Sequence, residues 1–222
     1  MSQLYLVPTP IGNLGDMTFR AVEVLKSVDL ILAEDTRTSG KLLKHYEIET
    51  PSTAFHAHNE HKRVEHFAKE IERGISIALI SDAGTPGISD PGFLLARECH
   101  KSGLRVEALP GPTAFVPALV ASGLPCDKFY FEGFLPHKKG KQTRLEFISS
   151  LPCTVVLYES PHRIVKTLGQ LAEHYGENHQ ACVARELSKL HEEVRTESLA
   201  ELKNHFETTP PKGEFVVVIG AK

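Results

Sequence analysis

Three loops rich in glycine and proline contain the residues of this sequence whose types and spacing are best suited to chemistry. The first loop (residues 8–16) holds two prolines and two glycines, and the second loop (residues 81–92) holds three glycines, two prolines and two aspartates. The third loop (residues 110–114) reads Pro-Gly-Pro-Thr-Ala. Loops of this kind let a ligand approach closely and offer it backbone N–H and C=O groups. They indicate a site that holds a small molecule by its backbone, or else tight turns that only connect elements.

Other patterns argue against several kinds of chemistry. His56, His58 and His61 have no carboxylate or cysteine partners at metal-ligand spacing, so we predict no metal site. The segment at residues 140–143 lacks the upstream glycine and the terminal Lys-Ser/Thr pair of a phosphate loop. No G-x-S-x-G elbow is present, and the first loop is not a G-x-G-x-x-G dinucleotide fingerprint.

The three loops follow predicted strands in an alternating strand and helix pattern. An amphipathic helix is predicted from Asn59 to Gly74, and another is predicted to begin at Asp90-Pro91 and run toward Gly103. Such alternation favours parallel strands with helical crossovers, in which ligands bind beyond the carboxyl ends of the strands. The predicted strands of this half are Leu4–Val7, Leu30–Ala33, Ile75–Ile80 and Leu104–Leu109.

The second half continues the alternation. Ser160-Pro161 is predicted to cap one helix, and Ser198 with Glu201 forms a capping-box pattern for another. The polar stretch 189–196 is either an added strand or a loop. We predict two closely packed α/β domains, 1–122 and 123–222, because no Gly/Ser linker separates them. The predicted strands are Phe129–Glu132, Thr154–Tyr158, Ala181–Arg185 and Phe215–Ile219.

Composition predicts a cytoplasmic protein without a membrane span. The 222 residues are 41% apolar and 24% charged, and no apolar run approaches the length of a spanning helix. The N-terminus lacks the pattern of an export signal, and the four cysteines are widely spaced, which favours a reducing compartment. The net charge of −3 does not predict nucleic-acid binding, but residues 137–144 form a concentrated basic loop.

The loops, taken in order, resemble the tetrapyrrole-methylase superfamily of S-adenosylmethionine-dependent methyltransferases. Within it, the chain is most similar to the ribosomal RNA small subunit methyltransferase I family. Each motif is weak by itself, but eight in the same order over nearly the whole chain are highly specific. The matching stretches are residues 7–16, 33–37, 58–60, 81–92, 109–112, 131–136, 158–163 and 185–189.

The resemblance implies the fold and the cofactor. It implies two α/β domains of the tetrapyrrole-methylase type, with the S-adenosylmethionine cleft between them, usually in a homodimer. The donor contacts of the superfamily fall on strand exits of both domains. The matching positions here are Pro8, Ser81, Asp82, Ala83, Gly84, Thr85, Thr113, Ala114, Glu159, Glu186 and Leu187.

The resemblance also implies a substrate, namely a cytidine in the decoding region of 16S rRNA in the small ribosomal subunit, methylated on its 2′ oxygen. We expect Glu186 and Lys189 to remove the proton of this hydroxyl or to stabilise the charge that its loss leaves. The alternative for this pair is a surface ion pair. RNA binding by an acidic chain requires local basic residues, and our candidates are Lys138, Lys139, Lys141 and Arg144, whose alternative is a solvated mobile loop.

Two departures and two alternative functions accompany the resemblance. Ser188 stands where the family usually has threonine, and typical members continue beyond the end of this chain with a C-terminal extension. The enzyme alternative is C-methylation of a tetrapyrrole of the uroporphyrinogen or precorrin type, although the first loop is less glycine-rich than that activity leads one to expect. The non-enzyme alternative is a module that binds S-adenosylmethionine without catalysis.

Overall fold

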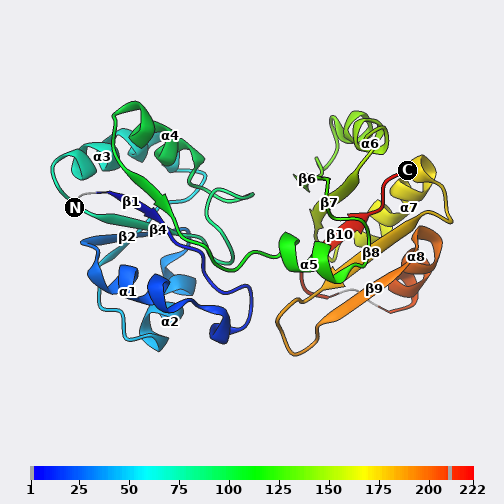
Figure 1. Ribbon diagram of the computed structural model, residues 1–222, viewed down its shortest axis with the longest axis horizontal. Coiled ribbons are helices and arrows are strands. Elements are labelled where there is room, and N and C mark those ends of the chain that lie inside the picture. Colours follow the sequence, from blue (N-terminus) through cyan, green and yellow to red (C-terminus); the bar gives the residue numbers. More distant parts are fainter. Residues whose placement is uncertain (1–2, 210–211) are drawn as a thin grey trace. The chain divides into compact units, whose positions relative to one another are not determined.

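The computed structural model describes residues 3–209 and 212–222, and it divides into two compact units (Figure 1). One unit ends at Thr113 and the other begins at Ala114. The predicted boundary after residue 122 would have assigned helix α5 (Phe115–Ala121) to the first unit. Instead, α5 contacts the second sheet, with Ala118 and Leu119 buried against it. The division therefore lies one helix earlier than the sequence pattern suggested.

The first unit is built on a five-stranded sheet with the order β3-β2-β4-β1-β5, and all neighbouring strands are parallel. The predicted strands are present. The sheet has one further strand, β3, which was not predicted because its sequence, Ser-Thr-Ala, contains no apolar run. Since the sheet is parallel, the loops that follow the five strands all lie at the same edge of the sheet. The strands are β1 (Leu4–Leu6), β2 (Leu30–Ala33), β3 (Ser52–Ala54), β4 (Ile77–Ile80) and β5 (Val106–Ala108).

Helices cover both faces of this sheet (Figure 1). Helices α1 and α2 enclose one core and α3 and α4 the other, and a short 3-10 turn, η1 (Leu14–Asp16), precedes α1. Helix α3 buries the four apolar positions that its 3.6-residue period predicted, Val64, Phe67, Ala68 and Ile71. The helices are α1 (Phe19–Ser27), α2 (Thr36–His45), α3 (Glu60–Glu72) and α4 (Phe93–Lys101).

The prediction for the start of α4 was wrong. The N-cap position is Gly92, with φ of 139°, and not Asp90. Asp90 and Pro91 lie in the preceding turn, where Gly87 N–H donates to the Pro91 carbonyl at 3.1 Å. A Cβ atom at Gly92 would lie 2.9 Å from Leu79 Cδ2, so the second loop packs tightly on β4 before the helix begins.

The second unit has a sheet with the order β6-β7-β10-β8-β9, in which only β6 and β7 are parallel. The prediction of parallel strands was therefore wrong for this sheet, apart from the pair β6 and β7. The β8–β9 connection is too short for a helical crossover, and β10 enters between β7 and β8 after α8. The strands are β6 (Phe129–Phe134), β7 (Thr154–Glu159), β8 (Gln180–Arg185), β9 (Glu193–Ser198) and β10 (Phe215–Ile219).

Helices α6, α7 and α8 pack on one face of the second sheet, and α5 packs on the other (Figure 1). The predicted capping box of α8 is confirmed by reciprocal bonds between Ser198 and Glu201. Ser160 does not cap α7 as predicted, because a turn intervenes and Arg163 occupies the cap position. The helices are α6 (Lys141–Ser149), α7 (Ile164–Tyr175) and α8 (Leu199–Thr208).

No helix within the described residues is long and apolar enough to cross a bilayer.

Candidate functional site

The first, second and third loops meet at the carboxyl edge of the first sheet. Thr9 and Gly84 form an isolated antiparallel bridge with two N–H···O bonds of 2.9 Å. Thr9 Oγ1 donates to the Ser81 carbonyl at 3.0 Å, and Ser81 Oγ donates to the Gly84 carbonyl at 3.1 Å. Thr85 Oγ1 donates to the carbonyl of Pro112 at 3.0 Å. Loops that are far apart in sequence are thereby held as one rigid cluster.

Glycines allow the close approach of these loops. Gly84 has φ of 81°, in the left-handed region that favours glycine. At Gly111, a Cβ atom would lie 2.8 Å from Pro8 Cβ, which is closer than real Cβ contacts allow. The predicted S-adenosylmethionine contacts of the first unit therefore lie on loops that could not pack this closely if Gly84 or Gly111 carried a side chain.

A group of carboxylates lies beside the cluster at the exits of β2 and β4. The backbone N–H of Asp35 donates to Asp82 Oδ1 at 3.1 Å. Burial raises the pKa of Glu34, and the neighbouring Asp82 raises it further. Desolvation likewise raises the pKa of Asp82. By contrast, hydrogen bonds from Arg37 lower the pKa of Asp35 to about 2, and this side chain caps α2.

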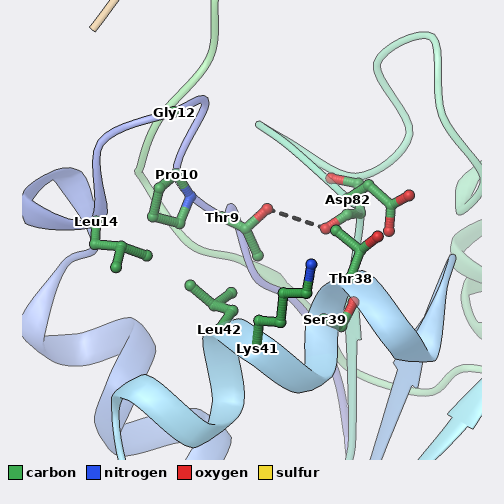
Figure 2. A pocket seen from close by; sticks show the side chains of 10 residues that line it. Thr9, Pro10, Gly12, Leu14, Thr38, Ser39, Lys41, Leu42 and Asp82 are labelled. Atoms are coloured by element: carbon green, nitrogen blue, oxygen red, sulfur yellow. Dashed lines mark hydrogen bonds between the residues drawn. The ribbon is translucent and has the colours of Figure 1, made fainter. Parts of the chain in front are cut away.

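A pocket of about 220 Å³ opens between the first loop and α2 (Figure 2). Ser81 and Asp82 are the predicted donor residues that line it. No function was predicted for the α2 residues that line the pocket, although α2 begins at Thr36, inside the matching stretch at residues 33–37. The position of α2 directly after the exit of β2 could have indicated a role in ligand binding. The lining residues are Thr9, Pro10, Gly12, Leu14, Thr38, Ser39, Lys41, Leu42, Ser81 and Asp82.

The carboxylate of Glu159, which was predicted to contact S-adenosylmethionine, is hydrogen-bonded to neighbouring residues of the second unit. Its side chain is 0% exposed. Oε1 accepts from Arg163 Nε at 2.7 Å and from Ser160 N–H at 2.8 Å, and Oε2 accepts from Thr167 Oγ1 at 2.7 Å. Lys141 Nζ donates to the same Thr167 oxygen at 3.0 Å. This geometry assigns Glu159 to a buried polar network that joins β7, α6 and α7.

The predicted catalytic pair is brought together at the exit of β8. Lys189 Nζ donates to Glu186 Oε1 at 2.8 Å and to Glu214 Oε2 at 2.9 Å. Burial alone would raise the pKa of Glu186, but the hydrogen bonds from Lys189 and from the Glu214 backbone outweigh it and lower that pKa. Burial alone would lower the pKa of Lys189, but its two carboxylate partners raise it. The pair therefore stays charged at neutral pH.

The backbone holds this pair in an unusual conformation. Glu186 and Ser188 have φ of 51° and 67°, in the left-handed region, although neither is glycine. A Cβ atom at Gly213, whose φ is 88°, would overlap the Glu186 side chain. Left-handed residues that are not glycine concentrate at functional sites, so this backbone conformation makes the segment a candidate for function.

The other predicted donor positions divide between the two units. Thr113 ends the first unit beside Gly84, with its Cα 3.9 Å from an ideal Cβ at that glycine. Ala83 is exposed near the start of the second loop. Ala114 and Leu187 are partly buried against the apolar cluster beneath α5.

The basic segment at residues 137–144 is not one mobile loop, which corrects its interpretation. Lys141 begins α6 and is buried at 7% exposure, and this burial lowers its pKa. Arg144 donates to Glu132 and Tyr130, and these hydrogen bonds raise its pKa; its guanidinium also lies over the Phe147 ring. Among the four predicted RNA contacts, only Lys138 and Lys139 are exposed and without a protein partner in the described residues.

Residues 3–209 and 212–222 contain no group of three or more His, Cys, Asp or Glu side chains placed to hold a metal ion.

Comparisons with known proteins agree with these features. Residues 3–203 match the family described as Tetrapyrrole (Corrin/Porphyrin) Methylases. The chain is 49% identical to a Synechocystis sp. protein and 48% identical to a Vibrio cholerae protein, both named Ribosomal RNA small subunit methyltransferase I. These alignments cover 99% and 97% of this chain, and 79% and 76% of the two relatives.

Solved structures show the same fold at low sequence identity. A diphthine synthase has a TM-score of 0.77 at 14% identity, with 100% of this chain and 90% of that chain covered. A uroporphyrin-III-C-methyltransferase from Thermus thermophilus has a TM-score of 0.68 at 20% identity, with 98% and 94% covered. The predicted fold class is therefore confirmed. The chain belongs to the tetrapyrrole methylase family and, within it, to the ribosomal RNA small subunit methyltransferase I family.

Proposed function

We propose that this protein transfers a methyl group from S-adenosylmethionine to the 2′ oxygen of a cytidine in 16S rRNA of the small ribosomal subunit. The observation that carries the proposal is the hydrogen-bonded cluster of the first, second and third loops. This cluster occurs in a chain that is about half identical to relatives named for small-subunit rRNA methylation. We further propose a homodimer in the cytoplasm, and light scattering would test the dimer.

The loop cluster suits a donor held mainly by its backbone. Gly84 and Gly111 let the three loops pack closely, which brings their backbone groups together where an adenosyl group could bind. The backbone N–H groups of Ala83 and Thr85 donate to no protein acceptor within the described residues. Pro8, Ser81 and Thr113 complete the proposed contacts in the first unit. That the donor also touches the second unit stays a prediction.

When bound, the donor would supply an electrophilic methyl group on sulfur, and this chain must align a ribose hydroxyl with it. Alignment and exclusion of water would contribute most of the rate. Because Lys189 stays protonated, we propose that it stabilises the developing charge on the 2′ oxygen. Glu186 is a weak base with a lowered pKa, so it would orient Lys189, and the hydroxyl proton would be released to the bulk solvent outside the site.

Replacing Lys189 by methionine should lower the single-turnover rate about 100-fold, the typical effect of removing one charge-stabilising donor. The affinity for S-adenosylmethionine should change little. The matched control is Glu214→Gln, which removes the more exposed partner of Lys189 and should leave the rate within about threefold. An unchanged rate in Lys189→Met would mean that the contacts of Lys189 with Glu186 and Glu214 form only a surface ion pair.

Lys138 and Lys139 remain the candidates for phosphate contacts. Replacing both with alanine should raise the apparent KM for small subunits and flatten its dependence on salt by about 0.7 to 0.9 per lost contact. Replacing the exposed Lys26 and Lys69 with alanine is the control for net charge. If the two double variants have the same salt dependence, the RNA surface lies elsewhere.

The proposed function is tested by two measurements on the purified protein. Isothermal titration with S-adenosylmethionine should give saturable binding, and undermethylated small subunits should then accept one labelled methyl group per particle on a cytidine ribose. Donor binding without transfer to RNA would support the non-catalytic module. Transfer to a tetrapyrrole in place of RNA would support the C-methylation alternative.

A further inference from the structure

The pocket beside α2 contains a buried hydroxyl group that the described residues leave without a partner. Ser39 is 3% exposed and lines the pocket, and no side chain or backbone group in the described residues bonds to its Oγ. A serine inside a helix can bond back to the carbonyl four residues earlier, but Ser39 Oγ does not. A buried polar atom without a partner destabilises a fold. A ligand in the pocket would provide the missing partner.

The pocket also presents a cation to which the described residues offer no counter-ion. Lys41 is exposed, and its side chain forms no ion pair or hydrogen bond within the described part of the chain. Figure 2 shows its Nζ pointing up from α2 into the pocket, toward the side on which Thr9 and Asp82 lie. Thr38, one turn earlier, adds a hydroxyl from the same helix. This end of the pocket suits an anion with oxygen atoms.

The wall of the pocket formed by Asp82 and Thr9 carries hydrogen-bond acceptors, so a ligand must provide the hydrogen-bond donor there. Asp82 Oδ1 accepts from the Asp35 N–H, and Asp82 belongs to the pocket lining with further acceptor capacity on its carboxylate. Thr9 Oγ1 already donates to the Ser81 carbonyl, so it can only accept from a ligand. The volume of about 220 Å³ is smaller than a typical drug-sized site. The pocket therefore fits a fragment with an anionic end and a hydroxyl or amine end.

We propose that this pocket binds one ribose-phosphate unit of the RNA substrate. Lys41 contacts the phosphate, Ser39 and Thr38 bond to its oxygens, and Asp82 and Thr9 accept from a sugar hydroxyl or a base amine. The inference rests on the proposed function and adds a substrate subsite to it. Because Ser81 and Asp82 also belong to the second loop, the subsite adjoins the proposed donor loops.

Two variants test the subsite, and one matched control accompanies them. Lys41→Met should raise the Kd for a 16S-derived RNA oligonucleotide about tenfold and reduce the salt slope by about 0.7 to 0.9. Ser39→Ala should raise this Kd about fivefold without lowering the melting temperature, because it removes an unpartnered buried hydroxyl. Lys44→Met, on the same helix but not in the pocket lining, should leave RNA binding and its salt slope nearly unchanged.

The experiment uses fluorescence anisotropy for RNA without the donor, calorimetry for S-adenosylmethionine, and methyl transfer to small subunits. RNA binding that is weakened by Lys41→Met and Ser39→Ala, with donor affinity retained, supports the subsite. Wild-type RNA affinity in both variants overturns it, and so does an equal loss of donor affinity, which would assign the pocket to the donor. If RNA binding depends on Lys41 but the wild type transfers no methyl group, the subsite stands and the proposed function fails. A wild type that neither binds the oligonucleotide nor methylates small subunits overturns both.

Discussion

Replacing Gly84 by valine should abolish binding of S-adenosylmethionine while the chain still folds. Valine would have to adopt φ near 81°, which a β-branched residue rarely does. Its Cβ would lie 3.6 Å from Ile11 Cγ2 and 3.9 Å from Pro112 O and Thr113 Cα, so the two further methyl groups would crowd the first and third loops. We expect the Kd to rise more than about 100-fold, since the loop backbone would no longer be open to the donor. The strain at one such residue is about 1–3 kcal/mol, which is less than the stability of a typical domain.

Gly103→Val is the matched control for this experiment. Gly103 has φ of 68°, so valine there would carry a similar backbone strain. This glycine lies just after α4, and apart from its chain neighbours no atom of the described residues lies within 4 Å of the place that its Cβ would take. Both variants should lose similar stability in thermal melting, and only Gly84→Val should lose donor binding in calorimetry. Equal donor affinity in the two variants would reject the assignment of the second loop to the donor.

Replacing Glu159 by alanine should destabilise the second unit by about 3–5 kcal/mol, the usual consequence of removing one partner from a buried ion pair. Arg163 and Lys141, with side chains mostly withdrawn from water, would lose the carboxylate that balances their charge. Thr167 Oγ1 would lose its acceptor. Urea unfolding followed by circular dichroism measures the change. Glu159→Gln should have a smaller effect because the amide oxygen can still accept.

Glu173, an exposed carboxylate on α7, provides the control for Glu159. Glu173→Ala should change stability by no more than about 0.5 kcal/mol. At a temperature where Glu159→Ala remains folded, we expect it to bind S-adenosylmethionine with near wild-type affinity. Full stability combined with lost donor binding would instead make Glu159 the donor contact that the family resemblance implies.

Elements that depend on neighbouring residues could be predicted from the sequence alone. The apolar stripe of α3 and the capping box of Ser198 and Glu201 were predicted correctly, because both arise within a few residues of chain. The strand β10 (Phe215–Ile219) was predicted residue for residue, since its apolar run is long enough for a buried strand. The loops at strand exits were also identified, because clustered glycines and prolines interrupt helices and strands and favour turns.

The side chains that remain available for function could be identified only from the tertiary fold. Lys141 and Glu159 have the residue types of a phosphate contact and a donor contact, yet both are buried in a network whose members come from β7, α6 and α7. The unpartnered hydroxyl of Ser39 and the exposed cation of Lys41 likewise come to line one pocket, within the described residues, only when α2 is placed beside the first loop. Local patterns record the propensity of a segment, whereas hydrogen-bond satisfaction and desolvation depend on partners distant in sequence.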